Sequence, residues 1–363
     1  MKKNNDFPSN GNLRYFIHLD TVRCYAVFMV VFAHIFKIWT WKDATESLFP
    51  LGQTGVVLFF VLSGFLITYI LLKEPQHKPI AQSFKQFYIR RSLRIFPIYY
   101  LFLAICYIAN ISNVNDYGFA LWFYLGNFYI LNHNSWIGEY SHLWTLAVEE
   151  QFYLLWPFLV LFLRTRTKAL LILFVSVIAL ASLARFYLLS NGFSYTQAKV
   201  FPLANVDFFA LGALIALGNI CCQQTVRSSG YPLVVTGLIL YYGSYYVFEK
   251  MIFYMIGQLS IGLVATGVII IALFSQAKEG ILHNRLTVHV GKISYGIYLY
   301  HNAVVAHYAQ IASYFGIDAG NSLYSKIVIS VVFTLIIAEL SFRCIEEPCL
   351  RFKRRFKYEV QHA

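Results

Sequence analysis

The stretch DTVRCYAVFMVVFAH, residues 20–34, joins an apolar run to an aspartate and an arginine at one end and a histidine at the other. An α-helix turns by about 100° per residue, so Arg23 and His34, eleven residues apart, lie about 20° apart around its axis. Asp20 falls about 40° to the other side of His34. The three side chains therefore share one stripe, with about 16 Å of rise between Arg23 and His34. A stripe of this kind on an apolar helix predicts a polar interior rather than a face toward lipid.

The composition predicts an all-α fold, a polytopic membrane helical bundle of about ten transmembrane helices. The 363 residues are 58% hydrophobic and 13% charged, and the mean hydropathy is +0.58. Such a chain is too apolar for a soluble protein. Apolar runs long enough to span a bilayer recur along its whole length, at 18–38, 52–72, 95–112, 143–163, 168–190, 202–221, 231–248, 251–274, 293–313 and 321–343.

The basic residues predict the orientation of these helices. With the N-terminus inside, most of the 29 Lys and Arg fall on cytoplasmic segments and helix ends, so we expect both termini to be cytoplasmic. The chain then divides into an N-terminal tail (1–17), a transmembrane domain (18–343) and a basic C-terminal tail (344–363). The first residues lack a cleavage pattern and are expected to form a retained tail. The net charge of +12 fits contact with anionic lipid, and no motif predicts a nucleic-acid partner.

The six cysteines and the histidine spacing predict neither a disulfide framework nor a metal site. No two cysteines form a CxxC pair, which is the usual spacing of thiolate metal ligands and of redox cysteines. No HxxxH or HExxH pattern occurs either. The sequence also has no GxSxG motif, which makes a serine nucleophile of the hydrolase type unsupported.

Ionisable side chains within apolar helices are candidates for function, because each costs at least about 2.5 kcal/mol to insert. His34 is the first of these, since imidazole is the commonest general base for deprotonating a hydroxyl near neutral pH. Glu149 and Glu150 lie two turns into the helix at 143–163, near the depth of His34. Adjacent helical residues point about 100° apart, so only one of the two is expected to face the core. A carboxylate there can orient the imidazole; hydrogen bonds that merely tie helices together are the alternative.

Arginines cluster at the expected cytoplasmic end of the third helix. Arg91 and Arg94 share one helix face at a spacing of three residues, and planar guanidinium groups suit phosphate oxygens. Arg90 lies beside them. Anchoring at the membrane surface is the alternative interpretation, and it explains clustered arginines in many membrane proteins.

Other features predict packing more than chemistry. Glycines in GVVLFFVLSGFLITYI, residues 55–70, permit close helix contact. Arg185 and Asp207 are expected near the outer ends of neighbouring helices, where they can pair. The aromatic segment 113–142 predicts a short helix at the membrane interface. His301 is a second, weaker candidate for a polar core.

Taken together, several stretches resemble the acyltransferase-3 family of bacterial integral-membrane O-acyltransferases. They occur in the order of the family and extend from residue 19 to residue 348. The matching stretches are LDTVRCYAVFMVVFAH, GVVLFFVLSGFLIT, FYIRRSLRIFPIYY, LWTLAVEEQFYLLWP, ISYGIYLYH and FRCIEEP.

The resemblance implies ten helices, an acyl-coenzyme A donor, usually acetyl-CoA, that enters from the cytoplasm, and transfer to a sugar hydroxyl. The acceptor would be a cell-envelope glycan or lipid-linked glycan: lipopolysaccharide O-antigen, another surface polysaccharide or a glycan precursor, with a small hydroxylated metabolite also open. The protein would be a multi-pass protein of the bacterial cytoplasmic (inner) membrane. The fused periplasmic hydrolase-like domain found in some members is not expected here, so acceptor recognition would fall to the membrane domain.

Residue by residue, His34 matches the essential histidine of the family and Glu149 the glutamate of its WSLxVE-like motif. Thr145 replaces the usual serine of that motif and keeps the hydroxyl, and Trp144 precedes it as a secondary candidate. The resemblance thus implies that His34 is the catalytic base and that Glu149 supports it.

The donor residues implied by the resemblance are Arg91 and Arg94, the RxxR pair, and the helix-1 arginine, Arg23. Asp20 and His301 are further secondary candidates, the latter falling where the family has a histidine after SYxIYL. Coenzyme A phosphates would lie at the arginines, with the pantetheine arm running toward His34.

Two mechanisms and two other functions remain open from the sequence, one of them a membrane scaffold or sensor, in which His34 and Glu149 would be replaceable without loss of function. His34 can deprotonate the acceptor hydroxyl for direct transfer, or it can carry the acyl group itself. A polytopic transporter or flippase of a lipid-linked glycan or small metabolite would also need charged residues inside a helical bundle.

Overall fold

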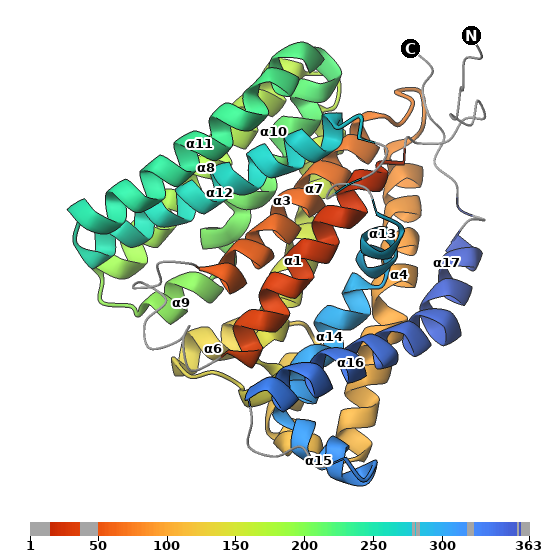
Figure 1. Ribbon diagram of the computed structural model, residues 1–363. Coiled ribbons are helices and arrows are strands. Elements are labelled where there is room, and N and C mark those ends of the chain that lie inside the picture. The colour runs from red at the N-terminus through yellow and green to blue at the C-terminus, as the bar shows by residue number, and fades with distance from the viewer. Residues whose placement is uncertain are drawn as a thin grey trace.

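The computed structural model describes residues 15–36, 50–277, 280, 284–317, 323–353 and 356. Residues 1–14 of the expected N-terminal tail lie outside these ranges, as do residues 354, 355 and 357–363 of the expected C-terminal tail, and so do Lys37 and Lys42. Within the described ranges every regular element is a helix (Figure 1), which confirms the all-α class.

The helices differ widely in length, and long ones alternate with short connecting ones. The α-helices are α1 Ile17–Ile35, α3 Leu51–Leu72, α4 Ile80–Ile108, α5 Gly118–Trp122, α6 Gly126–His133, α7 Trp144–Leu163, α8 Thr167–Ser190, α9 Tyr195–Val200, α10 Val206–Cys221, α11 Gln223–Val247, α12 Lys250–Phe274, α13 Arg285–Lys292, α14 Ser294–Ala306, α15 Tyr308–Tyr314, α16 Leu323–Ser341 and α17 Glu347–Lys353. Three 3₁₀ helices, η1 Ile111–Tyr117, η2 Gly138–Leu143 and η3 Pro202–Asn205, and one π-helix, η4 Phe342–Glu346, complete the described chain.

Eight helical segments of the described chain are long and apolar enough to cross a membrane, so the chain is a polytopic helical membrane protein. The other two of the ten expected spans differ from the prediction. At 231–248 the helix α11 is 25 residues long, but its many tyrosines lower its mean hydropathy below that of the others. The expected helix at 293–313 is broken at His307 into α14 and α15.

Two further helices extend beyond the expected bounds. The helix α4 begins at Ile80, just after Pro79, and not at residue 95. Its first four turns carry arginines, lysine and glutamines, which lower the hydropathy but are good helix formers. After α16 the chain stays helical through the π-helix η4 to Lys353, past the expected end at 343.

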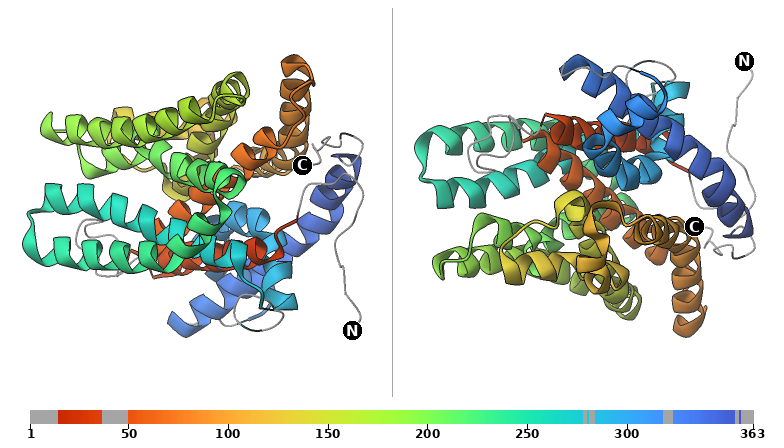
Figure 2. Two further views of the ribbon diagram at one scale, coloured as in Figure 1. Left: turned by 90° about the horizontal axis from the view of Figure 1, so that it is seen from above. Right: turned by 90° about the horizontal axis from the view of Figure 1, so that it is seen from below.

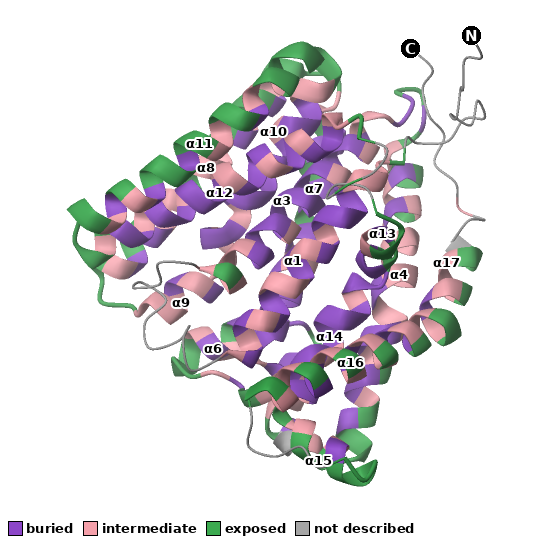
Figure 3. Cartoon of the chain, viewed as in Figure 1, coloured by how far each residue is buried: buried purple, intermediate pink, exposed green. Residues whose placement is uncertain are grey.

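The helices α1 and α3 lie at the centre of the molecule, between α8, α10, α11 and α12 on one side and α14, α16 and α17 on the other (Figures 1 and 2). In its most apolar window, 78% of α3 is buried, against 22% of α8. Figure 3 shows the same contrast between the buried α1 and α3 and the exposed outer face of α11. The central pair therefore carries the residues that face the interior, and α8 and α11 form the periphery.

Glycines let α3 and α10 approach one another closely, as the sequence predicted for the glycines of residues 55–70. A Cβ atom built on Gly64 of α3 would lie 2.0 Å from the Phe209 carbonyl oxygen of α10, and one on Gly212 of α10 would lie 2.0 Å from the Val61 carbonyl oxygen. Backbone therefore meets backbone along this contact, where no larger residue fits.

Buried ions in the peripheral helices are paired. The Arg185 Nη2 of α8 donates a hydrogen bond of 2.6 Å to Asp207 Oδ1 of α10, as expected from the sequence. Both side chains are almost fully buried. Since an unpaired charge at this depth is costly, the pair fixes α8 against α10.

The segment 113–142 forms short helices, as predicted, and closes one end of the bundle. Tyr99 of α4 donates to the Leu121 carbonyl oxygen at 2.8 Å. Gln151 of α7 donates to the Tyr124 carbonyl oxygen at 2.9 Å and exchanges hydrogen bonds with Asn127. These side chains satisfy carbonyl groups that the short helices leave unpaired.

We predict that Gly212→Ala destabilises the protein by about 1–3 kcal/mol, because the added methyl group would push α10 away from α3. Gly243→Ala on α11 is the matched control, since a Cβ there meets nothing within 4 Å. The midpoint of thermal unfolding in detergent measures both. Equal midpoints for Gly212→Ala and the wild type would contradict the close contact.

Candidate active site

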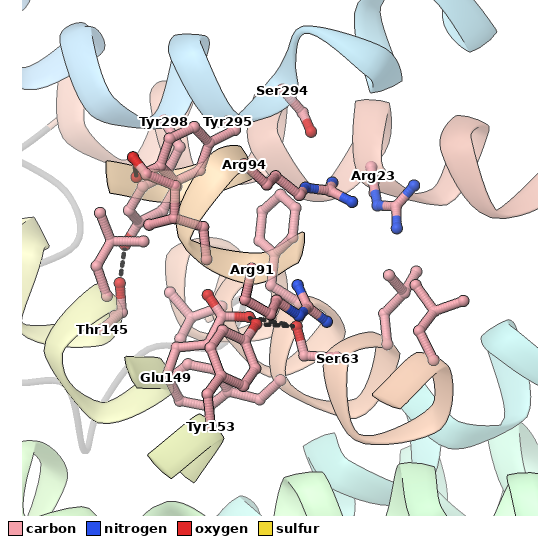
Figure 4. Close-up of a pocket in the computed structure, with 17 residues that line it drawn as sticks. Arg23, Ser63, Arg91, Arg94, Thr145, Glu149, Tyr153, Ser294, Tyr295 and Tyr298 are labelled. Atoms are coloured by element: carbon pink, nitrogen blue, oxygen red, sulfur yellow. Dashed lines mark hydrogen bonds between the residues drawn. The ribbon is translucent and has the colours of Figure 1, made fainter. Parts of the chain in front are cut away.

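A narrow inner pocket lies between α1, α3, α4, α7 and α14, with a volume of about 80 Å³ (Figure 4). Among the residues that line it are three arginines, Arg23 of α1 and Arg91 and Arg94 of α4, and one carboxylate, Glu149 of α7. We call it the arginine pocket. The excess of guanidinium groups suits an anionic ligand, and their planar forks suit phosphate.

Glu149 is held in the arginine pocket by two hydroxyl groups. Ser63 of α3 and Tyr153 of α7 both donate hydrogen bonds to Glu149 Oε1, and Figure 4 shows the three side chains clustered beside Arg91. The Arg91 guanidinium carbon lies 4.4 Å from the centre of the Tyr153 ring, a favourable cation–π contact. The two helices α4 and α7 are thus joined by a charged cluster.

Asp20 supports Arg23 from one turn away. Its carboxylate accepts hydrogen bonds from the Arg23 guanidinium and from the Tyr15 hydroxyl. The backbone of Asp20 packs directly against Gly291 of α13. A Cβ atom built on Gly291 would lie only 1.8 Å from the Asp20 carbonyl oxygen. Asp20 therefore positions Arg23 and partly neutralises it.

A larger cavity of about 840 Å³ lies further along α1 and α3, and we call it the histidine cavity. His34 of α1 and His142 of η2 line it, together with Trp144 at the start of α7. Its wall has further polar and aromatic side chains, namely Tyr117, Trp136, Glu139, Ser141, Lys199, Tyr298 and Asn302. Its size suits a ligand larger than a monosaccharide.

One ring nitrogen of His34 lies against a backbone carbonyl oxygen. The Nδ1 atom lies 2.9 Å from the Val30 carbonyl oxygen, and because a carbonyl can only accept, Nδ1 carries the proton. The lone pair of the neutral ring is then on Nε2. His34 can therefore accept a proton at Nε2, as a general base requires.

His301 contacts His34 directly. His301 Nε2 lies 3.3 Å from His34 Nδ1, and His301 Nδ1 lies 2.7 Å from the Tyr298 carbonyl oxygen. That carbonyl keeps the His301 proton on Nδ1, so His301 Nε2 is an acceptor for the His34 Nδ1–H. His301 is fully buried and can stabilise positive charge that develops on His34.

His142 is a residue of this site that the sequence analysis did not single out. Its two ring nitrogens lie 3.0 and 3.2 Å from the carbonyl oxygens of Glu139 and Leu299. Its ring centre is 4.8 Å from that of His301 and 6.3 Å from that of His34. It precedes the WTLAVEE motif by two residues, and only this adjacency could have pointed to it.

The two cavities share part of their wall. Val56 of α3 and Tyr298 of α14 line both. The Tyr298 hydroxyl lies 2.5 Å from the Thr145 hydroxyl and donates to the His142 carbonyl oxygen at 3.1 Å. These hydrogen bonds fix Tyr298 at the boundary between the two cavities. The hydroxyl of Thr145, which replaces the usual serine, therefore helps to position Tyr298.

Six of the predicted site residues line these two chambers, while Asp20 lies behind Arg23 and His301 behind His34. Arg23, Arg91, Arg94 and Glu149 line the arginine pocket, while His34 and Trp144 line the histidine cavity. The expected stripe on α1 thus faces polar space at both ends. Glu149, which the sequence placed beside His34, lies on the arginine side of the shared wall, and the side chain seen against His34 Nδ1 is that of His301.

No group of three or more His, Cys, Asp or Glu side chains suited to a metal ion occurs within the described residues. The rings of His34, His142 and His301 lie close to one another. In each of the three, the Nδ1 atom lies within hydrogen-bonding distance of a backbone carbonyl oxygen.

A polytopic helical bundle with a charged pocket and a histidine cavity in line defines an integral membrane protein with an interior site. The chain belongs to the acyltransferase-3 family: a family model described as an acyltransferase domain matches residues 16–341. Each predicted site residue lies inside this match.

Three relatives illustrate the similarity. A Staphylococcus aureus protein named as a candidate O-acetyltransferase, SACOL0978, is 30% identical over 96% of this chain. The Listeria monocytogenes peptidoglycan O-acetyltransferase OatA is 30% identical over 92% of it. The Bacillus subtilis protein YrhL, named as a candidate peptidoglycan O-acetyltransferase, is 28% identical over 92%. The matches cover 59%, 56% and 55% of these relatives, so the chain spans little more than half of their length. No solved structure matches it.

We predict that neutral His34 carries its proton on Nδ1 and that its Nε2 is unprotonated, because the Val30 carbonyl oxygen accepts a hydrogen bond from the Nδ1–H. Nitrogen NMR of protein labelled with ¹⁵N-histidine at alkaline pH, with the His34 signals assigned from a His34→Gln variant, measures the tautomer. A proton found on Nε2 would contradict this assignment.

Proposed function

We propose that this chain is a membrane O-acetyltransferase that moves an acetyl group from acetyl-CoA to a hydroxyl of a cell-envelope glycan. The observation that carries the proposal is the alignment of the arginine pocket and the histidine cavity along α1, with a shared wall at Val56 and Tyr298. The arginine pocket suits the donor and the histidine cavity suits the acceptor. The acetyl group then has to cross only the wall between them.

The arginine pocket is the proposed donor site. Arg23, Arg91 and Arg94 would bind the phosphates of coenzyme A, whose charge matches their guanidinium groups. The pocket is narrow, so only the slim pantetheine arm would extend along α1 toward His34, over a rise of about 16 Å. Glu149 would keep Arg91 and the wall of the pocket in place through Ser63 and Tyr153.

His34 is the proposed general base. Its Nε2 would take the proton of the acceptor hydroxyl while the oxygen attacks the thioester carbonyl carbon. The carbon–sulfur bond then breaks, and the leaving thiolate takes the proton from the His34 imidazolium, which gives free coenzyme A and regenerates the neutral base. The His34 imidazolium would be stabilised by the two acceptors at its Nδ1–H, the Val30 carbonyl and His301. His301 would thus do what the sequence analysis expected of Glu149.

Direct transfer is favoured over an acyl-histidine intermediate by the size of the larger chamber. The histidine cavity, at about 840 Å³, is large enough to hold an acceptor next to His34 while the donor occupies the other chamber. Both substrates can then be bound together, as direct transfer requires.

The acceptor would be an envelope glycan, with peptidoglycan favoured because two of the relatives carry it in their names. Lipopolysaccharide O-antigen and other surface polysaccharides are the alternatives to compare in the same assay. The aromatic rings of Tyr117, Trp136 and Trp144 on the cavity wall suit stacking against sugar faces.

We further propose ten membrane spans with both termini in the cytoplasm of a bacterium. The eight apolar helical segments would account for eight of these spans. The ninth would be α11, which packs along α12, and the tenth would be α14 together with α15. An even number of spans keeps both ends on one side, and the basic residues at Arg91, Arg94 and Arg164 would mark the cytoplasmic face.

We predict that His34→Ala lowers acceptor-dependent release of thiol from acetyl-CoA by at least about 100-fold, because the general base is lost. The assay uses purified protein in detergent, with and without peptidoglycan strands or O-antigen polysaccharide. His133→Ala is the matched control, since His133 is exposed on α6 and outside both chambers.

A wild-type rate in His34→Ala would refute the assigned base. If the wild type binds no acetyl-CoA and releases no thiol with any glycan, but moves a lipid-linked glycan across vesicles, the protein is a transporter.

We predict that Arg91→Ala and Arg94→Ala each raise the KM for acetyl-CoA about tenfold, because a charge-assisted hydrogen bond to phosphate is lost. The kcat at saturating donor should change little. Arg166→Ala is the control, since Arg166 is exposed in the turn after α7. A KM equal to that of the control in both variants would place the donor phosphates elsewhere.

A further inference from the structure

One polar side chain borders both chambers, and the proposed reaction does not yet use it. Among the described residues that line the arginine pocket and the histidine cavity, Val56 and Tyr298 are common to both, and of these only Tyr298 carries a polar group. Under the proposed function the acetyl group crosses this wall, so its carbonyl oxygen passes next to Tyr298. Neither general-base catalysis by His34 nor binding of the phosphates by the arginines calls for a hydroxyl group at this position.

The Tyr298 hydroxyl itself lies where the two chambers meet. It is 2.5 Å from the Thr145 hydroxyl and 3.1 Å from the His142 carbonyl oxygen. Thr145 lines the arginine pocket, whereas His142 lines the histidine cavity. Figure 4 shows the contact between Tyr298 and Thr145 at the edge of the arginine pocket. The hydroxyl is therefore placed at the point that an acyl group would have to cross.

The aromatic ring of Tyr298 is held by its neighbours, so the hydroxyl oxygen has a fixed position. The residue is buried. Its ring centre lies 6.0 Å from that of Phe59 of α3, and 5.6 Å from the ring centres of both His142 and His301. Only the hydroxyl hydrogen then has to turn for the group to find a new acceptor. A donor fixed in this way costs little reorganisation during a reaction.

The hydrogen bonds around Tyr298 allow this turn. Thr145 Oγ1 also donates to the His142 carbonyl oxygen, at 3.0 Å. When the Tyr298 O–H turns toward a ligand, the hydrogen bond from Thr145 to that carbonyl oxygen remains. The turn is therefore inexpensive, because the buried carbonyl oxygen keeps a donor.

We infer that Tyr298 is a catalytic residue, whose hydroxyl donates a hydrogen bond to the carbonyl oxygen of the acetyl thioester in the transition state. The inference rests on the proposed function. As the acceptor oxygen bonds to the carbonyl carbon, one electron pair of the C=O bond moves onto the carbonyl oxygen, and the Tyr298 O–H stabilises this negative charge. The C=O bond then forms again, and the carbon–sulfur bond breaks with its electron pair on sulfur. The thiolate takes its proton from His34, so Tyr298 keeps its own proton throughout.

The test replaces Tyr298 by phenylalanine, which keeps the ring and removes only the hydroxyl group. Thiol release from acetyl-CoA is measured with the glycan acceptors named above. Because the charge on the carbonyl oxygen develops only in the transition state, Tyr298→Phe should lower kcat about 100-fold and leave the KM for acetyl-CoA unchanged. Tyr300→Phe is the matched control on the same helix and should keep the wild-type kcat. The Tyr300 hydroxyl lies 2.9 Å from that of Ser341, and Tyr300 does not line either chamber.

A second variant tests the turn of the hydroxyl and leaves the Tyr298 side chain intact. Thr145→Val removes the donor that would remain at the His142 carbonyl oxygen when Tyr298 turns. The turn then costs a hydrogen bond, so kcat should fall about tenfold. Thr145→Ser, which retains a hydroxyl group, should recover most of this loss.

Three results would overturn the inference. Equal kcat values for Tyr298→Phe and Tyr300→Phe would show that the Tyr298 hydroxyl does not stabilise the transition state. Weaker binding of free coenzyme A by Tyr298→Phe, in proportion to its loss of kcat, would show that Tyr298 only shapes the wall. A wild-type kcat in Thr145→Val would show that no turn of the Tyr298 hydroxyl is needed.

Calorimetric binding of trifluoroacetonyl-coenzyme A without acceptor separates this inference from the proposed function. The hydrated ketone of this analogue is tetrahedral, like the carbon that the acceptor attacks. Tyr298→Phe should bind the analogue about tenfold more weakly than the wild type, and free coenzyme A equally well. Binding of the analogue that depends on Tyr298, without thiol release by the wild type, would keep the hydroxyl contact and refute the transferase. Thiol release by Tyr298→Phe at the wild-type kcat would keep the transferase and refute the role of Tyr298.

Discussion

Polar groups inside a membrane protein must find partners within the protein, and this constraint organises the whole interior. Arg185 meets Asp207 in the periphery, Arg23 meets Asp20 on α1, and Glu149 is held by two hydroxyl groups. The pairs at the periphery are closed and only hold helices together. Those at the centre border open space, so the same rule that stabilises the bundle also leaves charged groups facing a ligand.

Close packing of α3 determines where that space lies. Backbone contact at Gly64 brings α10 against one face of α3, and a Cβ on Gly55 would lie 2.5 Å from the Ala26 carbonyl oxygen of α1. Between these contacts α3 presents Val56 and Ser63 to the two chambers. Small residues thus pull three helices together and leave the larger side chains of the same helix to shape the site.

Much of this arrangement follows from sequence, and the exceptions have physical causes. The length and polarity of the helices gave the fold class, and helical spacing placed Arg23 and His34 on one polar stripe. The partner of His34 was not predictable, because depth along two helices does not fix their rotation: Glu149 faces the arginines and His301 reaches His34 instead. His142 was missed since it lies in a 3₁₀ turn before the apolar run. The break at His307 occurs within a stretch that remains apolar and helix-forming on both sides.

The wall shared by the two chambers also bears on how such a protein can change over evolutionary time. Val56 and Tyr298 line both chambers, so a substitution at either position changes the shape of both chambers. Residues that border a single chamber, such as Lys199 on one side or Arg94 on the other, can drift independently. Under the proposed function, a new acceptor preference is therefore accessible through single substitutions that border one chamber, whereas a substitution in the shared wall changes the space for donor and acceptor together.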